Sequence, residues 1–250
     1  MISVYGITDR GVLRSQNQDA CCYMQVNEDT AWGVVCDGMG GAKAGDIASR
    51  IGVEAFKAHM LRHFEEKTLT HAEALSVAVE EGNDIIFHCA ASDKECAGMG
   101  TTLVGLIIEG SAVQVINIGD SRAYLIGEDF IKRITRDHSV VETLVEKGSL
   151  TAEQARIHPQ KNLITRALGT SRSAEADVYE LQMQDGQWLL LCSDGLINEM
   201  PDTEIYQVVR QGETPEAVCD HLLDIALARD ASDNVTVILF RYQDKEAGVV

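Results

Sequence analysis

The chain has 250 residues, of which 45% are hydrophobic and 24% charged, a composition typical of a globular protein large enough to bury a core. Asp and Glu number 39 against 21 Lys and Arg, and the resulting net charge of −18 disfavours nucleic acid and anionic membranes as partners. The sequence shows neither a signal-peptide pattern nor a run long enough to span a bilayer, and its seven cysteines lack a disulfide-framework spacing, so we expect a cytoplasmic protein with reduced thiols.

No linker, repeat or low-complexity segment interrupts the chain, so we expect residues 1–250 to form one domain. In the first half, a β-branched apolar run predicts a buried strand at residues 30–36. Residues 46–64 then place apolar side chains at helical spacing. Thr70 followed by Glu73 is a capping-box pattern and predicts the start of a second helix.

The second half of the chain contains the remaining strand patterns. Apolar runs predict strands at residues 102–108, 112–118, 123–126, 188–192 and 235–240. The short break between the second and third of these runs predicts a β-hairpin over residues 112–126. Residues 137–173 lack strand patterning, and we expect a helical excursion there over one end of the sheets. Thr214 followed by Pro215 predicts the last helix. Strands and helices that cluster in this way predict an α+β fold, with antiparallel sheets flanked by helices.

An aspartate stands at the end of one predicted strand after another. Asp37, Asp120 and Asp194 each follow an apolar run, and Asp233 directly precedes the last one. Each aspartate alone is typical of an ordinary turn. Four carboxylates at the ends of neighbouring strands would converge, however, and they would repel each other unless a cation neutralised them.

Oxygen ligands without thiolate or imidazole favour hard cations such as Mg²⁺ or Mn²⁺, and Gly38 after Asp37 lets a backbone carbonyl approach such an ion. Two such ions about 3.5 to 4 Å apart bridge a water, lower its pKa and favour in-line displacement at phosphorus. Arg14, close in sequence to Asp19, could bind the phosphoryl oxygens with its guanidinium, although an arginine near a chain start is more often a solvated surface residue.

The chain resembles the metal-dependent protein phosphatases, the PPM or type 2C serine/threonine phosphatases, and especially their compact bacterial members. The resemblance covers nearly the whole chain and depends on six motifs in order: residues 14–19, Asp37-Gly38-Met39-Gly40-Gly41, Gly98-Met99-Gly100-Thr101-Thr102, Gly119-Asp120-Ser121-Arg122, Ser193-Asp194-Gly195 and Ser232-Asp233-Asn234. It implies a four-layer αββα sandwich, in which two antiparallel β-sheets pack face to face between helices. It also implies hydrolysis of phosphoserine or phosphothreonine on proteins by a hydroxide that bridges two Mn²⁺ or Mg²⁺ ions, without a phosphoenzyme.

The resemblance implies roles at the first two metal sites for five residues. Asp37 would bridge both metals, and the carbonyl of Gly38 would bind the second of them. Asp194 and Asp233 would complete the first metal site, and Asp19 would act through a metal-bound water.

Three further roles follow from the same resemblance. Arg14 would bind the substrate phosphate, and Asp120 would hold a weaker third metal together with Asp194. Residues 137–173 would form a flap that shapes substrate choice. Phosphorylated proteins and an opposing serine/threonine kinase are the expected partners, and a monomer is the expected state.

Two positions depart from the pattern of the eukaryotic members. Gln18 stands where those members have Glu, and Met39 stands where they have His. A thioether cannot donate a proton, so we expect any proton that the leaving group needs to come from water. Compact bacterial members share this state, so these departures do not imply an inactive enzyme.

Other interpretations remain beside this one. A catalytically silent binding module of the same fold and a small-molecule phosphoesterase are the alternative functions. His59 and His63 could share a metal, but residue 60 is Met where a zinc protease needs Glu, and we expect two histidines on a helix surface. Cys36 and Cys192 flank the predicted metal acids, and we expect both to pack as small apolar side chains.

Overall fold

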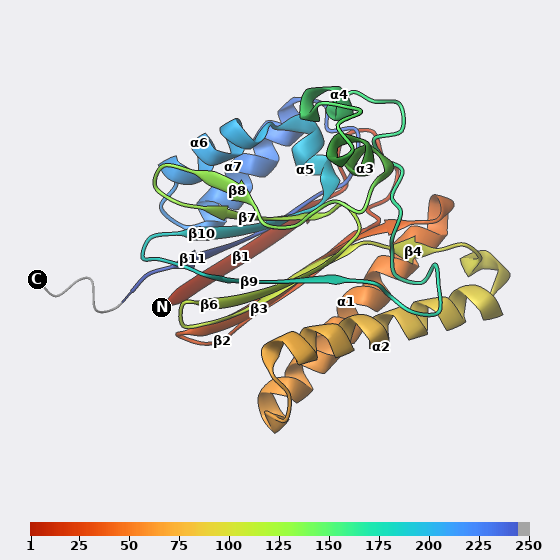
Figure 1. Cartoon of the computed structure of the whole chain (residues 1–250), viewed down its shortest axis with the longest axis horizontal. Coiled ribbons are helices and arrows are strands. Elements are labelled where there is room, and N and C mark those ends of the chain that lie inside the picture. The colour runs from red at the N-terminus through yellow and green to blue at the C-terminus, as the bar shows by residue number, and fades with distance from the viewer. Residues whose placement is uncertain (245–250) are drawn as a thin grey trace, which may run out of the picture.

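Two antiparallel sheets stack face to face in the computed structural model, with helices on both outer faces (Figure 1). The structure describes residues 1–244, without the side chains of residues 41–43. The four-layer αββα sandwich predicted from the sequence is therefore confirmed. No helix in this described part of the chain is both long enough and apolar enough to cross a bilayer.

The first sheet has the strand order β1-β11-β10-β7-β8. Its members are β1 (Ile2–Asp9), β7 (Arg122–Ile126), β8 (Ile131–Arg133), β10 (Trp188–Cys192) and β11 (Val235–Tyr242). The second sheet has the order β2-β3-β5-β6-β9, and a short strand, β4, pairs with the end of β3. Its members are β2 (Asp19–Asn27), β3 (Thr30–Met39), β4 (Gly100–Thr101), β5 (Leu103–Glu109), β6 (Ala112–Ile118) and β9 (Asp177–Gln182).

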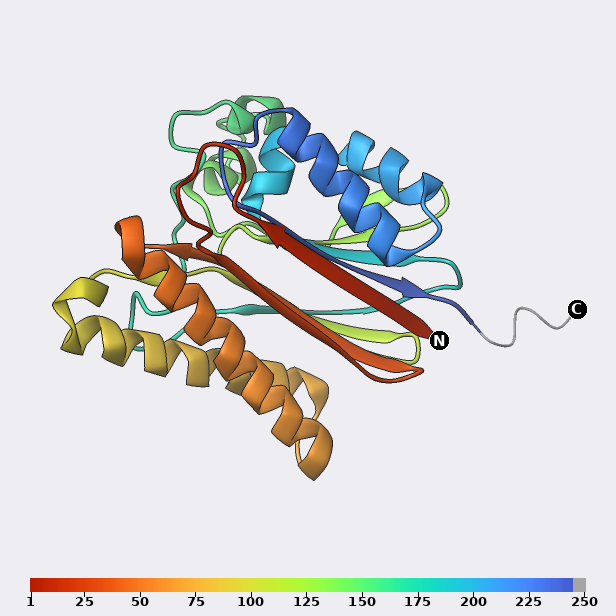
Figure 2. The ribbon, with the colours of Figure 1, turned by 180° about the vertical axis from the view of Figure 1, so that it is seen from behind.

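The helices divide between the two outer faces. The long helices α1 (Gly41–Glu66) and α2 (His71–Ser92) cover the second sheet, and a short 3₁₀ helix, η1 (Lys94–Cys96), follows them. On the other side lie α5 (Asp194–Glu199), α6 (Asp202–Gln211) and α7 (Pro215–Ala228), and Figure 2 shows α7 running along the first sheet. Two short helices, α3 (Val140–Glu146) and α4 (Ala152–Arg156), lie over one end of the sandwich, beside α5 (Figure 1).

Three apolar cores separate these layers. One lies between the sheets and includes Val35, Leu106 and Ile238, all with no exposed surface. The other two lie under α1 and α2 and under α5 to α7. Because these three cores are closely packed, they hold both sheets in place up to the ends of their strands.

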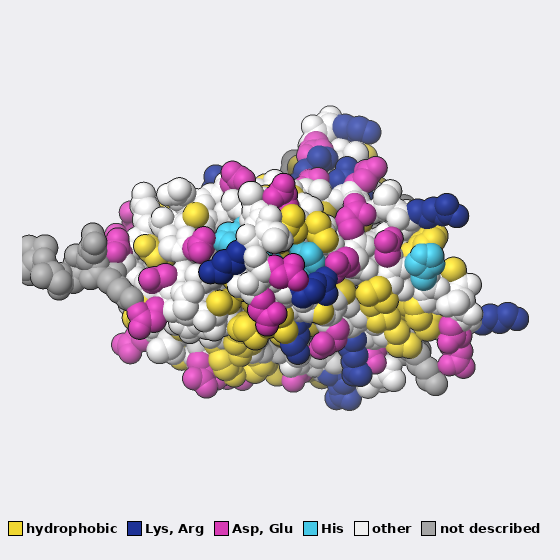
Figure 3. Space-filling model, turned by 90° about the horizontal axis from the view of Figure 1, so that it is seen from below, with side chains coloured by type: hydrophobic (Ala, Val, Ile, Leu, Met, Phe, Trp, Pro, Cys, Tyr) yellow, Lys and Arg dark blue, Asp and Glu magenta, His cyan; other side chains and the backbone are white. Residues whose placement is uncertain are grey.

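On the face covered by α1 and α2, acidic and basic side chains are interspersed rather than segregated (Figure 3).

The strands and helices predicted from local sequence signals are present, whereas β1, β2, β8 and β9 were not predicted. Each of the six predicted runs is a strand, and α2 begins with the capping box predicted at Thr70 and Glu73. The hydroxyl of Thr214 accepts a hydrogen bond from the amide of Ala217 at the start of α7, as its capping pattern predicted. The predicted excursion over residues 137–173 contains the two short helices α3 and α4.

The predicted hairpin over residues 112–126 is wrong. β6 pairs with β5 and β9, whereas β7 pairs with β10 and β8 in the other sheet. The chain therefore crosses from one sheet to the other at residues 119–121. This crossing carries Asp120 to the edge where the two sheets meet the α3–α4 segment.

Candidate active site

A cavity of about 470 Å³ lies at the end of the sandwich where β3 runs into α1 and β10 runs into α5. Its lining includes six of the seven predicted site residues: Arg14, Asp37, Gly38, Asp120, Asp194 and Asp233. The seventh, Asp19, is buried and lies directly opposite Asp37 in the register of β2 and β3. The structure therefore brings the whole predicted set together from distant parts of the chain.

The acids come from both sheets. Asp19 and Asp37 belong to neighbouring strands of the second sheet, whereas Asp194 and Asp233 flank β10 and β11, which are neighbours in the first sheet. Asp120 lies at the crossing between the sheets. Because these strands are paired within the two sheets and packed against the cores, the carboxylates are held at one edge despite their like charge.

Two glycines at the site allow segments of the backbone to lie very close to one another. A Cβ on Gly38 would lie 2.0 Å from the carbonyl oxygen of Gly45, in the first turns of α1. A Cβ on Gly195 would lie 1.9 Å from the carbonyl oxygen of Asn234. Both distances are far below van der Waals contact, so any larger residue would push these segments apart.

Two hydroxyl groups donate to one oxygen of Asp19. Its Oδ2 accepts hydrogen bonds from the hydroxyls of Ser193 at 2.7 Å and Thr236 at 2.6 Å. Burial raises the pKa of Asp19 to about 7, because the two hydroxyl donors offset only part of the cost of burial and the charges of Asp194 and Asp233 raise it further. Its other oxygen, Oδ1, is buried and has no hydrogen-bond partner among the described residues.

The half-buried acids of the site are also difficult to ionise. Burial, and then the charge of Asp19, raises the pKa of Asp37 well above its usual range. Burial together with Asp194 does the same for Asp120. Burial and Asp233 raise the pKa of Asp194, whose Oδ1 is again buried without a hydrogen-bond partner in the part of the chain described. The site therefore contains more negative charge than the protein's own groups compensate.

These oxygens suit hard divalent cations. Two buried carboxylate oxygens without a hydrogen-bond partner among the described residues, beside carboxyls with raised pKa values, are typical of acids that bind a cation. Within residues 1–244, no three Asp, Glu, His or Cys side chains form a ready-made coordination shell. The carboxylates instead take protein partners: Asp233 pairs with Arg14, and Asp194 accepts from Asn198.

Arg14 points its guanidinium at the acid cluster. Its Nη2 donates to Oδ2 of Asp233 at 2.7 Å, while 49% of its side chain stays exposed. Asn234 anchors the loop that carries Arg14: its Nδ2 donates to the carbonyls of Arg10 and Gln16, and its Oδ1 accepts from the amide of Gln18. Arg14 is thus an exposed residue at the mouth of the cavity, and its ion pair with Asp233 orients it toward the acids.

The sequence analysis missed several side chains that shape the site. Thr236 and Ser193 hold Asp19, and Asn198 donates to Asp194 at 3.1 Å. Ser193 belongs to a quoted motif, and Asn198 lies four residues after Asp194, one helical turn along α5. Thr236 carries no signal of its own in the sequence.

The histidines and cysteines take no part in the cavity. His59 and His63 are 6% and 7% exposed, so the expectation of two surface histidines is wrong. His59 contacts Glu81, and Nε2 of His63 lies 2.8 Å from Nδ1 of His71. Cys36 and Cys192 are fully buried, as expected, and burial raises the pKa of both thiols.

Comparison with known proteins gives a consistent result. A family model described as protein phosphatase 2C matches residues 13–222. The serine/threonine phosphatase stp of Listeria monocytogenes is 36% identical over 240 residues, which cover 93% of this chain and 92% of that protein. The crystal structure of the serine/threonine phosphatase Stp1 from Staphylococcus aureus superposes with a TM-score of 0.89 at 36% identity, covering 98% of this chain and 96% of the other. The catalytic domain of PstP, in complex with two manganese ions, gives a TM-score of 0.83 at 30% identity, with 97% and 99% of the two chains covered.

Proposed function

Because the chain belongs to the protein phosphatase 2C family and is a metal-dependent serine/threonine phosphatase, we propose that the acids at the end of the sandwich hold its divalent cations. Asp37 would bridge two ions with the Gly38 carbonyl on one of them, and Asp194 and Asp233 would complete the other site. Asp19 would act through water. Asp120, with Asp194, would hold a third and weaker ion. We propose Mn²⁺ or Mg²⁺ for all of them, because the donors are all oxygen.

One observation carries this proposal. Asp37, Asp120 and Asp194 are half-buried at one cavity and Asp19 is buried opposite Asp37, and burial and neighbouring carboxylates raise the pKa of all four. Such a cluster lowers the stability of the fold unless a cation compensates it. Bound divalent cations would supply that compensation, and with it the activation of water and the neutralisation of charge on phosphorus.

The chain's own residues would orient the substrate. Arg14 has an exposed guanidinium at the cavity mouth, and its planar fork can bind two phosphoryl oxygens at once. Met39 lines the cavity where a proton donor would be useful, and its thioether cannot act as one. The leaving alkoxide would therefore take its proton from water.

Direct attack on phosphorus without a phosphoenzyme is part of the proposal. The cysteine nearest to the acids in sequence, Cys36, is fully buried, and burial raises the pKa of its thiol well above its usual range. Cys192 is equally buried and its thiol pKa is also raised. Neither thiol offers the low pKa that a covalent mechanism needs.

We propose phosphorylated proteins as the substrates, with a serine/threonine kinase that phosphorylates the same proteins as the opposing enzyme. Arg14 is exposed at the mouth of the cavity, so a phosphorylated segment on a protein surface could reach its guanidinium. A phosphothreonine peptide should therefore be hydrolysed with a higher kcat/KM than a nucleotide. The opposite order would indicate a small-molecule phosphoesterase.

The test is Asp37→Asn, with Asp84→Asn on the exposed surface of α2 as the matched control. We expect Asp37→Asn to lose Mn²⁺-dependent hydrolysis of a phosphothreonine peptide and to bind fewer Mn²⁺ ions in calorimetry. Asp84→Asn should match the unmodified protein in both measurements. Full activity and unchanged Mn²⁺ stoichiometry in Asp37→Asn would place the metals elsewhere.

A further inference from the structure

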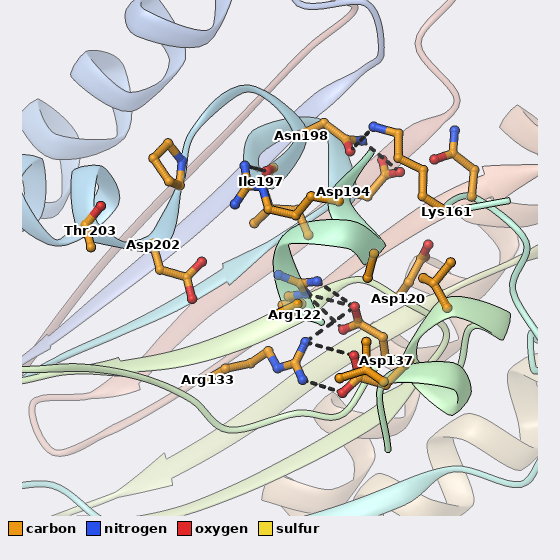
Figure 4. A pocket seen from close by; sticks show the side chains of 18 residues that line it. Asp120, Arg122, Arg133, Asp137, Lys161, Asp194, Ile197, Asn198, Asp202 and Thr203 are labelled. Carbon is orange, nitrogen blue, oxygen red and sulfur yellow. Dashed lines mark hydrogen bonds and ion pairs between the residues drawn. The ribbon is translucent and has the colours of Figure 1, made fainter. Parts of the chain in front are cut away.

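Two cysteines that the proposed hydrolysis does not use lie together where α2 ends. Cys89 belongs to the last turn of α2, and Cys96 is the last residue of the short helix η1. Neither residue lines the cavity of the candidate active site or the cavity of about 380 Å³ that adjoins it under α3 and α4 (Figure 4). Both thiols are free in the structure.

One residue joins the backbones of the two cysteines. Asp93 ends α2 and begins η1. Its amide donates to the carbonyl of Cys89 at 3.1 Å, and its carbonyl accepts from the amide of Cys96 at 3.1 Å. The chain therefore turns back at Asp93 and sets η1 against the end of α2. The side chain of Cys96, which is 4% exposed, enters the apolar core under α1 and α2, and Cys89 packs against the same core.

The two thiols interact with each other. Burial raises the pKa of Cys96, and a hydrogen bond with Cys89 and the charge of Cys89 raise it further. Cys96 is therefore kept as a neutral thiol, whereas Cys89 is half-buried and more accessible to a small solute. A pair of this kind combines a sulfur that an oxidant can reach with a second sulfur that can resolve the product.

The chain after Cys96 leads directly to the first metal-binding motif. The carbonyl of Cys96 accepts from the amide of Met99 at 3.1 Å. Met99 packs closely on Gly40, where a Cβ would lie 2.8 Å from the Cα of Met99. The next two residues form β4, which pairs with Gly38 and Met39 of β3.

The same segment also supports Asp37. The hydroxyl of Thr101 and the amide of Thr102 each donate to the carbonyl of Asp37 at 2.9 Å. A displacement of Cys96 would therefore be transmitted, through a few residues, to the backbone that carries the carboxylate of Asp37 and the carbonyl of Gly38.

We propose that Cys89 and Cys96 form a reversible disulfide when the protein is exposed to hydrogen peroxide, and that this disulfide weakens metal binding. Two sulfur atoms in a disulfide lie about 2.05 Å apart, well inside van der Waals contact, so Cys96 must move from its place in the core toward α2. The effect on the metals rests on the proposed roles of Asp37 and Gly38, whereas the disulfide itself does not.

The oxidation takes place in two balanced steps. The Cys89 thiolate attacks one oxygen of the peroxide, the O–O bond breaks, and the other oxygen leaves as water after it takes up a proton, so that Cys89 becomes a sulfenic acid. The sulfur of Cys96 then attacks the sulfur of Cys89, the S–O bond breaks, and a second water leaves. The two thiols lose two electrons and two protons in total, and the peroxide is reduced to two waters.

Trypsin separates the two cysteines and makes the disulfide directly observable. It cuts after Lys94, which lies between them in the sequence. Cys89 then belongs to the peptide of residues 68–94 and Cys96 to that of residues 95–122, and neither peptide contains another cysteine. After the full chain has been treated with hydrogen peroxide, we expect mass spectrometry of a non-reducing digest to find these two peptides joined. Dithiothreitol should separate them.

The oxidised chain should also bind Mn²⁺ less tightly once the peroxide has been removed. We expect its affinity in calorimetry to fall by about tenfold, as is typical when the support of a metal ligand is lost, and dithiothreitol to restore it. Cys89→Ser should keep its Mn²⁺ affinity after the same treatment, because Cys96 then has no partner. Cys22→Ser is the matched control: it removes a half-buried cysteine of β2 and should respond to peroxide as the unmodified protein does.

Three results would overturn the inference. Peptides that stay separate after peroxide treatment would exclude the disulfide. Joined peptides with unchanged Mn²⁺ affinity would show that the disulfide does not act on the metals. An equal loss of affinity in Cys89→Ser that dithiothreitol does not reverse would assign the effect to oxidation of a methionine such as Met39.

The reduced protein tests the proposed function separately. If Asp37→Asn binds Mn²⁺ as the unmodified protein does before any peroxide is added, the assigned metal site is wrong. The joined peptides would still show whether Cys89 and Cys96 form a disulfide, because their detection needs no metal.

Discussion

The hydroxyl of Thr236 donates a 2.6 Å hydrogen bond to Oδ2 of Asp19, and this bond joins the two sheets beneath the acid cluster. Asp19 begins β2 of the second sheet, whereas Thr236 belongs to β11 of the first. Since Thr236 gives its only hydroxyl proton to Asp19, the 2.7 Å contact between the hydroxyls of Thr8 and Thr236 must be donated by Thr8. Thr8 therefore donates to Thr236, and Thr236 donates to Asp19, so two hydroxyls of the first sheet connect to a carboxylate of the second.

Thr236→Val keeps the shape of this side chain and removes the donor to Asp19. We expect a loss of about 1.5 to 3 kcal/mol in the free energy of unfolding at pH 8, the usual range for a hydrogen bond to a charged group. The pKa of Asp19 in the metal-free protein should rise above about 7, because this donor lowers it. Urea unfolding at several pH values measures both effects.

Thr8→Val is the control for this prediction. It removes the donor to the Thr236 hydroxyl without touching Asp19, so it should cost about 0.5 to 1.5 kcal/mol, as a neutral hydrogen bond does. It should leave the pH dependence of unfolding unchanged. Equal effects of the two variants would show that Asp19 gains nothing specific from Thr236.

The sequence predicted those strands and helices whose signals are local. The capping box at Thr70 and the apolar runs depend on neighbours in the chain, and each was found where expected. β9 was missed because its side chains alternate between half-buried and exposed along an edge strand, without a continuous apolar run. The hairpin over residues 112–126 was wrong because two apolar runs around a turn do not specify their partners, and here each pairs elsewhere.

The acids of the site were predictable for a similar reason. Asp37, Asp120, Asp194 and Asp233 each adjoin a strand pattern, and the structure places all four around one cavity. Thr236 was missed because its importance depends on a contact with Asp19, which is far away in the sequence. The two residues are 217 positions apart. Only the folded chain shows this relation.

Arg14→Lys tests the phosphate-binding role of the guanidinium. Lysine keeps the charge and loses the planar fork, so kcat/KM for a phosphothreonine peptide should fall about 10- to 100-fold, the equivalent of one charge-assisted hydrogen bond. Mn²⁺ affinity should not fall, because Arg14 competes with a cation for Asp233. Arg10→Lys, at an exposed arginine of the same loop, should keep full activity. Equal kinetics for Arg14→Lys and the unmodified protein would exclude a bidentate contact.

The stability of the metal-free protein should fall as pH rises from about 4 to about 7. Burial raises the folded-state pKa of Asp19 to about 7, and those of Asp37 and Asp194 are also raised, so the folded state binds more protons than the unfolded state across this window. The stabilisation that these groups contribute is fully present below their pKa in the unfolded state. It is lost as the pH rises through their pKa in the folded state. For one group, a difference of one unit between its pKa in the folded and in the unfolded state corresponds to about 1.4 kcal/mol in the free energy of unfolding.

Urea unfolding with a chelator, at pH 5, 6, 7 and 8, measures this dependence. Saturating Mn²⁺ should reverse the trend, because the cation binds the ionised carboxylates and stabilises the folded state most at higher pH. Asp37→Asn should flatten the slope of the chelated protein. A chelated protein whose stability rises through this window would contradict the raised pKa values.

Gly195→Ala should separate the two acids that flank β10 and β11. A Cβ at this position would lie 1.9 Å from the carbonyl oxygen of Asn234, a backbone atom that cannot move without shifting Asp233. We expect a loss of about 1 to 3 kcal/mol in the free energy of unfolding, as for other overpacked sites, together with weaker Mn²⁺ binding because Asp194 and Asp233 move apart. Gly82→Ala in α2 is the control, since its Cβ would meet its nearest neighbour at 3.6 Å and should stabilise the helix by about 0.5 to 1 kcal/mol. If Gly195→Ala loses stability but keeps full Mn²⁺ affinity, the two acids do not share a metal.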